Sequence, residues 1–467
     1  MLDTHSKLDT YSHRGVLIAE STLPGETRAD GVTPAHPNGM QLSNDRFLIL
    51  NATLGFLGVD NSRSTTWQLR HGGYDGPVIK EGFFCQAVHD WDPLDLGVTW
   101  AKETGAMTGF GVPKGAIING RTPPHANRFV VKWRVCPRRY FASGPEGDYV
   151  KWYTASHEPY VRCYRTGWAQ FQLTDDENDL IITETCDEMR QRGYEDKPFV
   201  GQFCEDPSII NINQSYAAIW PYNRDHTEWV DISHSGWIGG GGTLRTLLYR
   251  FNTKLDRYEW VRTGRPMGGN TFEASIVPWG EDWVILTRRQ GVHKGVAWTR
   301  VSDPFSEPPK WTYRDDIGAT STPAAAFACP DGTIRLLTGD GFRSPHAEDP
   351  PRWRDHRNPL YLFTVDPDDE FRMTDCRTVF DIVAAGLPIP DEHARVVDMG
   401  KILPHVGGRE QTVVYRVRSS SMIRWEPEVE QRLNQHVHRM TPEIMNACAI
   451  YYGTMRYKED QPPMWTF

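Results

Sequence analysis

The sequence predicts an all-β fold, a six-bladed β-propeller with a short helical C-terminal tail. The first observation behind this prediction is the stretch 270–311, where four short runs of β-branched and aromatic residues are separated by Gly, Asp and Pro. The second is that similar runs recur along most of the chain. A single small sheet leaves both faces uncovered, so it needs neighbours of its own kind, and a ring of blades supplies them. Five or seven blades stay open, because residues 72–210 are hard to divide.

The composition agrees with a large β-rich fold. The chain has 467 residues, 39% of them hydrophobic, which is about three times the usual domain length of roughly 150 residues. Its 17 Trp, 18 Tyr, 19 Phe, 41 Gly and 33 Pro favour short strands and many turns over long helices. The net charge of −9 lacks the basic excess that binds nucleic acid or an anionic membrane surface. No apolar run approaches the roughly 18–20 residues of a membrane span, so we expect neither nucleic acid nor a membrane as a partner.

The cysteines and the N-terminus bear on the compartment. The eight cysteines show no C-x-x-C pair and no dense framework, and we interpret them as mostly buried thiols in a cytosolic setting. The first fifteen residues contain no apolar core of the kind that a signal peptide needs. The sequence as given therefore indicates a cytoplasmic location. A secreted or periplasmic location stays open for a chain whose leader has been removed.

Residues 1–32 are predicted to be an N-terminal arm that contains a closing strand. The run 15–20 (GVLIAE) has the apolar and β-branched content of a short strand. In a ring of blades, a strand from one end of the chain can complete the blade formed at the other end, which removes a free sheet edge. We expect 15–20 to close the ring in this way.

The propeller itself is expected to span residues 33–424. Blade one begins near Thr33 and has its first turn at Asn44 and Asp45. A long connection, 72–120, follows with Gly and Pro throughout. Loops of this length in a compact fold are either functional or disordered, and the aromatic and apolar content of this one argues against disorder.

The next two blades are less sharply bounded. Blade two is predicted to begin at Pro123 and to include Arg128–Val135, and blade three is predicted to begin near Ser215. Four consecutive glycines, 239–242, lie within blade three. They lack the strand-to-helix context of a phosphate-binding loop, so we interpret them as a flexible turn.

The last three blades and the tail have clearer signals. Blade four covers 273–313, blade five runs from Thr322 to Phe380, and blade six begins at His393. From Glu426 onward the spacing of apolar residues becomes helical, with Pro442 at a plausible helix start. We therefore expect residues 425–467 to form a helical tail that packs on the outside of the propeller.

Blade four also carries a family resemblance. An acidic residue, Glu273, opens its first strand, Arg289 ends its second, and Ser302-Asp303 follows its third, with Trp311 further on. This arrangement resembles a blade of the sialidase-like (BNR-repeat) β-propellers. Ser302-Asp303 and Trp311 resemble the Asp-box of that family, S-x-D-x-G-x-x-W, in a degenerate form.

The resemblance implies roles for several residues. In this family a Glu activates a Tyr nucleophile, an Asp is the acid/base, and arginines bind the carboxylate of the sugar. Glu273 matches the Glu, and Arg289 and Arg343 match two of the arginines. Tyr361 and Tyr415 are the candidates for the Tyr, and Tyr361 is also a candidate for substrate binding.

The chain departs from the family pattern in blade one. Residues 33–37 lie where the family has R-I-P, and His36 takes the place of the arginine. A sialic-acid carboxylate would lose one bidentate partner there. Asp60 falls about where the acid/base Asp lies, and the adjacent Arg63 could hold a carboxylate or lower the pKa of Asp60. The resemblance therefore implies a glycoside hydrolase that is not an ordinary sialidase.

A second hypothesis comes from the residues expected at the start of the innermost strands. They are His36, His125, Glu273, Thr322 and His393. Three histidines and a carboxylate at equivalent positions are not expected from packing alone. We assign His36 and His125 to catalysis, together with Asp60 and Glu273, and His393 to substrate binding.

These histidines allow two kinds of chemistry on an acidic sugar. They could hold a divalent metal ion, which is the one cofactor that the sequence points to. They could instead abstract the C5 proton of a uronic acid, with Tyr153 or Tyr160 returning a proton and Arg162 neutralising the carboxylate. Several polysaccharide lyases are propellers with such sets of residues.

Three functions therefore follow from the sequence, all with a carbohydrate as the partner. The first is a glycoside hydrolase of the sialidase-like superfamily, acting on glycosides that include those of acidic sugars. The second is a lyase acting on uronic-acid glycosides. The third is a carbohydrate-binding propeller without catalysis, because a fold alone does not determine function. The oligomeric state, the sugar and the linkage stay open.

Overall fold

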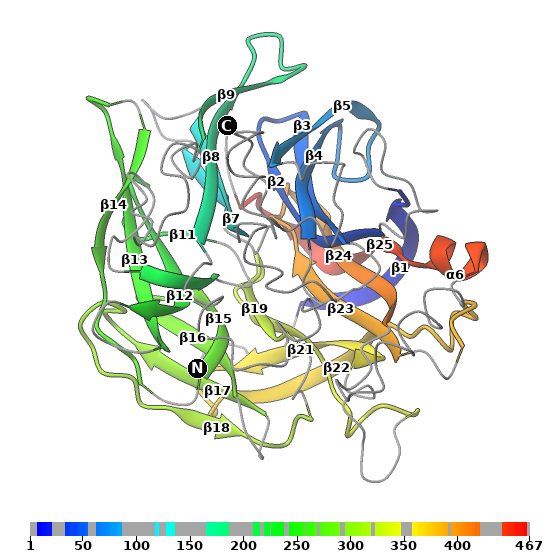
Figure 1. The fold of residues 1–467 in the computed structure, drawn as a ribbon. Coiled ribbons are helices and arrows are strands. Elements are labelled where there is room, and N and C mark those ends of the chain that lie inside the picture. Colours follow the sequence, from blue (N-terminus) through cyan, green and yellow to red (C-terminus); the bar gives the residue numbers. More distant parts are fainter. Residues whose placement is uncertain are drawn as a thin grey trace, which may run out of the picture.

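The computed structural model confirms the six-bladed β-propeller. It describes residues 7–20, 33–54, 62–85, 117–120, 128–135, 165–185, 209–214, 219–224, 226–237, 242–255, 257–268, 271–289, 295–318, 323–346, 357–390, 394–420 and 441–464. These residues form six antiparallel sheets arranged around a common centre (Figure 1). Figure 1 places β2, β15 and β19 towards the centre, and β5, β14, β18 and β22 towards the rim.

Blades one and two take their strands in chain order. Blade one consists of β2 (Thr33–Gln41), β3 (Arg46–Leu54), β4 (Ser62–His71) and β5 (Val78–Cys85). Blade two consists of β6 (Ile117–Gly120), β7 (Arg128–Val135), β8 (Arg165–Leu173) and β9 (Leu180–Thr185). The predicted start of blade two at Pro123 is therefore wrong. The innermost strand of blade two is β6, which lies at the end of the predicted connection 72–120. Arg128–Val135 is the second strand of the blade.

Blades three to five follow the same order. Blade three consists of β10 (Ile209–Gln214), β12 (Glu228–Trp237), β13 (Gly242–Asn252) and β14 (Arg257–Thr263), with the short β11 (Trp220–Pro221) beside β12. Blade four consists of β15 (Thr271–Trp279), β16 (Asp282–Arg289), β17 (Val296–Val301) and β18 (Thr312–Arg314). Blade five consists of β19 (Ala325–Ala328), β20 (Ile334–Gly339), β21 (Leu360–Asp366) and β22 (Arg372–Phe380). Blades four and five lie where the sequence predicted them.

Blade six is built from both ends of the chain. Its strands are β23 (Ala394–Ile402), β24 (Gly408–Ser420), β25 (Ala449–Gln461) and β1 (Leu8–Ile18), and β1 pairs antiparallel with β25. The expected closure of the ring by an N-terminal strand is thus found. The strand begins earlier than expected, at Leu8 rather than at Gly15.

The C-terminal tail is only partly helical. The helix α6 (Pro442–Ala447) has Thr441 as its N-cap, and the Thr441 hydroxyl accepts a hydrogen bond from the Ile444 amide at 3.3 Å. The expectation of a tail lying wholly outside the propeller is wrong, because β25 extends for 13 residues between β24 and β1. A short apolar run fits a strand or a helix equally well, and here two strand partners decide between them. Among the described residues, no helix is long and apolar enough to cross a membrane.

The core lies between the blades. β2 is buried along nearly its whole length and β20 along all of it, whereas the rim strand β22 is largely exposed. Strands covered on both faces carry nearly continuous apolar runs instead of a strict alternation. Aromatic side chains link neighbouring blades: Trp298 of blade four stacks on Phe371 of blade five, with ring centres 5.5 Å apart. This packing fixes the blades and therefore the positions of their ends.

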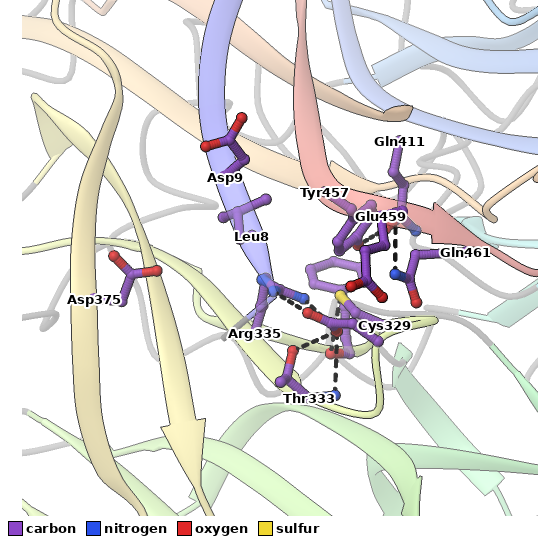
Figure 2. Close-up of polar contacts among 12 residues, drawn as sticks. Leu8, Asp9, Cys329, Thr333, Arg335, Asp375, Gln411, Tyr457, Glu459 and Gln461 are labelled. Carbon is purple, nitrogen blue, oxygen red and sulfur yellow. Dashed lines mark hydrogen bonds and ion pairs between the residues drawn. The ribbon is translucent and has the colours of Figure 1, made fainter. Parts of the chain in front are cut away.

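A buried polar seam joins blade five to blade six. Arg335 donates two hydrogen bonds to Asp331, at 2.9 and 2.6 Å, and Thr333 donates to the same carboxylate at 2.7 Å. The Arg335 guanidinium lies 5.5 Å from the centre of the Tyr457 ring, and the Tyr457 hydroxyl donates to Gln411 (Figure 2). Burial alone would raise the pKa of Asp331, but the hydrogen bond and charge of Arg335 lower it. The charge pair lies within blade five, and its Arg335 guanidinium meets blade six at the Tyr457 ring.

The closing strand is also tied to the rim of blade five. Arg377 of β22 donates to the backbone oxygens of Asp9, at 2.7 Å, and Leu8, at 3.4 Å. Asp375 accepts two hydrogen bonds from the same guanidinium, at 2.9 and 3.1 Å. Figure 2 shows Asp375 on β22 facing the start of β1. The strand that closes the ring therefore has a partner on each side.

His13 anchors the middle of β1. Its Nδ1 lies 2.6 Å from the Tyr415 hydroxyl, and its ring centre lies 4.8 Å from that of Phe380 and 5.8 Å from that of Tyr451. Burial lowers the pKa of His13 and raises that of Tyr415. The Tyr415 hydroxyl therefore keeps its proton and can donate it to a neutral imidazole.

We expect the stability of the protein to fall as the pH decreases below about 6.5, the ordinary pKa of His. Because the folded-state pKa of His13 is lower, the unfolded chain takes up the proton first, and protonation favours unfolding. Thermal melting between pH 8 and pH 5 should show this slope, and His13→Gln should reduce it. His71→Gln, at an exposed histidine of β4, is the control. An unchanged slope in His13→Gln would contradict the prediction.

Candidate functional site

The ring has two faces, each formed by strand ends, and the predicted site residues that the structure describes lie near one of them. Successive strands of a blade alternate in direction, and the first strand of every blade is innermost. The starts of the first and third strands and the ends of the second and fourth strands therefore lie on the same side. We call this side the site face. Glu273, His36, Arg289 and Arg343 all lie near strand ends on it.

Three inner strands share an irregularity close to the site face. His36 of β2, Glu273 of β15 and Met399 of β23 have φ of 50°, 48° and 54°. At each of them the pairing of the first strand with the second shifts register. A left-handed conformation is uncommon for residues other than glycine, and a bulge turns a side chain away from its regular direction. The same irregularity thus occurs in the inner strands of three blades.

Glu273 is held by an arginine from the neighbouring strand. Its Oε2 lies 2.9 Å from Nη2 of Arg288, and the two side chains are only 8% and 13% exposed. The catalytic role that the resemblance implies for Glu273 stays a prediction.

A second cluster gathers around the buried Asp398 of β23. Its carboxylate accepts hydrogen bonds from Arg416, at 2.7 Å to Nε and 2.6 Å to Nη2, and from Arg357 at 2.6 Å. Burial alone would raise the pKa of Asp398, but the positive charges of Arg416, Arg357 and Arg418 lower it. We call Asp398, Arg416, Arg357 and Arg418 the arginine cluster. Guanidinium groups gathered in this way are the side chains that commonly bind anionic groups.

His36 lies beside the arginine cluster. Its side chain is buried, and its Nε2 lies 3.4 Å from Nη1 of Arg416. Among the residues that the structure describes, there is no group of three or more His, Cys, Asp or Glu side chains that could hold a metal ion. His125 and His393 lie outside the described residues. The hypothesis of a metal ion at the three histidines therefore stays a prediction.

Arg289 points to different partners from those of Arg288. Its Nη1 lies 2.5 Å from the Asp315 carboxylate, and its guanidinium lies 4.5 Å from the centre of the Tyr313 ring. Neighbouring residues of a strand project to opposite sides. Arg288 therefore reaches Glu273, and Arg289 reaches the rim of the same blade. The predicted substrate-binding role of Arg289 stays a prediction.

Arg343 lies on the turn after β20, at the junction of blades four and five. It forms an ion pair with the buried Asp340 and donates to the backbone oxygen of Asp316 at 3.2 Å. The Tyr361 hydroxyl donates to the backbone oxygen of Arg343 at 2.9 Å. Burial raises the pKa of Tyr361, which disfavours ionisation to a nucleophilic phenolate. Tyr361 thus supports the turn that presents Arg343.

Of the other predicted residues, two lie in the described part of the chain and the rest lie outside it. Arg63 lies in β4, whose start is on the site face. Tyr415 lies in β24 of blade six, where its hydroxyl contacts His13 of the closing strand β1. The remaining predicted residues lie outside the described part of the chain: Asp60, Tyr153, Tyr160 and Arg162. Their roles stay predictions.

The degenerate Asp-box lies on the face opposite the site face. The Asp303 carboxylate accepts a hydrogen bond from the Phe305 amide at 2.9 Å, within the connection between β17 and β18. The Trp311 indole donates to the backbone oxygen of Met267 at 3.2 Å. These contacts hold the turn and fasten it to the preceding segment, so the motif has a structural role here.

Sequence reasoning missed Arg288 and the arginine cluster. Arg416 and Arg418 are two residues apart in β24, so they project to the same side of the strand. Two arginines at this spacing, alternating with the apolar Tyr415 and Val417, are a signal in the sequence that indicates a shared polar face. Nothing local indicated that Asp398 and Arg357 would join them.

Comparisons with known proteins add the fold context. No protein-family model matches the chain, and no curated protein matches it. Among solved structures, a protein of unknown function from Dyadobacter fermentans matches with a TM-score of 0.53 at 10% identity, over 96% of this chain and 99% of that chain.

Two enzymes of known class also match, with lower scores. A sialidase from Trypanosoma rangeli, in complex with 2,3-difluorosialic acid, has a TM-score of 0.48 at 9% identity, over 91% of this chain and 54% of that chain. This chain thus spans about half the length of that sialidase. Zg3597, a family 117 glycoside hydrolase from Zobellia galactanivorans, has a TM-score of 0.39 at 8% identity, over 99% of this chain and 96% of that chain. At such identities the likeness concerns the β-propeller fold alone.

Proposed function

We propose that this protein is a carbohydrate-active enzyme that hydrolyses glycosides of acidic sugars on the site face. The observation that carries this proposal is the arginine cluster, where Arg416 and Arg357 hydrogen-bond to the buried Asp398 carboxylate and the charge of Arg418 also acts on it. The planar fork of arginine matches a carboxylate with two parallel hydrogen bonds. A sugar carboxylate is therefore the kind of ligand group that this gathering of guanidinium groups suits.

Glu273 supplies the second part of the proposal. Hydrolysis of a glycosidic bond needs one group that protonates the leaving oxygen and another that assists attack at the anomeric carbon. Glu273, paired with Arg288 at 2.9 Å, suits the second role, either directly or by activating a tyrosine hydroxyl. Asp60 is proposed as the proton donor on the strength of the family resemblance. The leaving sugar then takes the proton, and water completes the hydrolysis.

The described residues favour hydrolysis over elimination. A lyase needs a base that removes a C5 proton. Of the histidines predicted for this step, His36 is the one among the described residues. His36 is buried and lies 3.4 Å from Arg416, which places it as a neighbour of the arginine cluster. Glu273 is paired with Arg288 at 2.9 Å, and a carboxylate beside a guanidinium matches the group that assists hydrolysis in the resembling family. This match supports the hydrolase as the first choice.

Product analysis tests the proposed function. The protein is incubated with a panel of acidic and neutral oligosaccharides while released reducing sugar and the ultraviolet absorbance of an unsaturated sugar are recorded together. We expect reducing sugar without a rise in absorbance, and with acidic substrates only. A rise in absorbance would show β-elimination and overturn the proposal. Binding without any product would show a carbohydrate-binding propeller without catalysis.

A further inference from the structure

Two exposed aromatic side chains stand apart from the rest of the described surface. Tyr313 is 54% exposed and Phe342 is 61% exposed. The other exposed large apolar side chains among the described residues are aliphatic: Val16, Val78, Ile181, Ile182, Leu255, Val261, Val383 and Val406. Single exposed aliphatic residues are ordinary on a protein surface. The two exposed aromatic rings are therefore the surface feature that we consider as a place for a ligand.

Hydrogen bonds bring the segments that carry these rings together. The Asp340 carboxylate accepts a hydrogen bond from the Gly318 amide at 2.8 Å, and the Gly341 amide donates to the Gly318 oxygen at 3.3 Å. Arg343 adds a third link to the segment after Tyr313, through the backbone oxygen of Asp316. Tyr313 is in β18, the fourth strand of blade four, and Phe342 follows β20, the second strand of blade five. Both rings therefore lie on the site face.

Each ring is held in place before any ligand arrives. The Arg289 guanidinium covers one face of Tyr313 at 4.5 Å, and Asp315 fixes that guanidinium at 2.5 Å. The Phe342 amide donates to the buried Asp340 carboxylate at 3.0 Å, so the turn that presents Phe342 is fixed as well. A ring that is already oriented loses little conformational entropy on binding.

The chemistry of this region matches a sugar ring. A pyranose has an apolar face of C–H groups, which packs on an aromatic ring, and a rim of hydroxyl groups that donate and accept hydrogen bonds. The exposed aromatic faces here stand beside the pairs Arg289–Asp315 and Arg343–Asp340, which offer donors and acceptors together. Ligand sites commonly combine such apolar surfaces with a few fixed polar groups.

We propose that Tyr313 and Phe342 form a subsite for a further sugar ring of the substrate, on the site face where blades four and five meet. This inference rests on the proposed function, because it takes a carbohydrate as the ligand. It adds that the ligand is an oligosaccharide or a polymer that extends from the centre of the ring across blades four and five. A single monosaccharide would leave the subsite unused.

The test measures how the binding affinity depends on the number of sugars in the oligosaccharide. Acidic and neutral oligosaccharides of one to six sugars are titrated into the Glu273→Gln variant, so that binding is recorded without turnover. We expect affinity to rise with length, and the double variant Tyr313→Ala, Phe342→Ala to lose about tenfold or more for the longer sugars. Its affinity for monosaccharides should stay unchanged. Leu255→Ala, at an exposed apolar residue between β13 and β14 on the opposite face, is the control.

The outcomes separate this inference from the proposed function. Affinity that does not depend on length, or that the double variant leaves unchanged, would overturn the subsite even if the wild-type protein hydrolyses its substrate. A length-dependent affinity that the double variant removes would support the subsite even if no hydrolysis is found. Equal losses in the double variant and in Leu255→Ala would also overturn it, because the effect would then not be local. Failure of every sugar to bind would overturn both proposals.

Discussion

Glu273→Gln is expected to lower the rate of glycoside hydrolysis by about a hundredfold to ten-thousandfold, the usual contribution of a positioned base. The substitution keeps the size of the side chain and a hydrogen-bond acceptor for Arg288, but it removes the charge that assists attack at the anomeric carbon. The measurement is the initial rate of reducing-sugar release from the best substrate of the panel. Substrate affinity should change much less than turnover, because the arginine cluster is untouched.

The matched control is Glu281→Gln in the same blade. Glu281 lies in the turn between β15 and β16, at the other end of the hairpin that carries Glu273, and it pairs with Arg224 in an exposed position. Its variant should keep full activity. A thermal melt of both variants shows whether each is folded. A folded Glu273→Gln protein with full activity would place the reacting group elsewhere.

Asp398→Asn is expected to reduce the free energy of unfolding by about 3–5 kcal/mol, the range found when one partner of a buried ion pair is removed. Arg416 and Arg357 would keep their charges in a buried place without the carboxylate that now accepts their hydrogen bonds. Chemical denaturation of the wild type and the variant measures the difference. We also expect weaker discrimination of acidic sugars, since the guanidinium groups would lose the partner that orients them.

A surface ion pair in blade five provides the control for this prediction. Asp369 pairs with Arg372 at 2.6 Å, and both side chains are more than half exposed. Asp369→Asn should cost less than about 1 kcal/mol, because solvent screens the pair. If Asp398→Asn proves equally mild, the arginine cluster is hydrated and its charge is less available to a ligand than we propose.

The fold was predictable where the signals are local. The strands at 273–277 and 283–287, with the turn between them, were found because short β-branched runs and a Gly-Glu-Asp turn are adjacent in the sequence. The tail was misjudged because the run 449–452 is apolar in a way that fits a helix or a strand. Only its pairing with β1 and β24 makes it a strand, and the pairing with β1 joins residues from opposite ends of the chain.

The site was predictable only in part for the same reason. Glu273 was found because it opens a strand in a recognisable blade. Its partner Arg288 was not predicted, because nothing in the local sequence distinguishes Arg288 from the adjacent Arg289, whose side chain projects to the other face of the strand. Arg357, Asp398 and Arg416 come from two blades and meet only through tertiary packing. No local pattern encodes such a meeting.

The closure of blade six sets the order in which this protein can mature. The closing strand β1 is made long before its partner, since His13 and Tyr415, which meet in the seam, are 402 residues apart. At a synthesis rate of about 5–20 residues per second, β1 waits on the order of half a minute for that partner. A hairpin within one blade needs only about 1–10 microseconds. Blades one to five can therefore assemble during translation, while the ring itself is completed afterwards. Until then β1 is an unpaired edge that a chaperone, or a second nascent chain, can occupy.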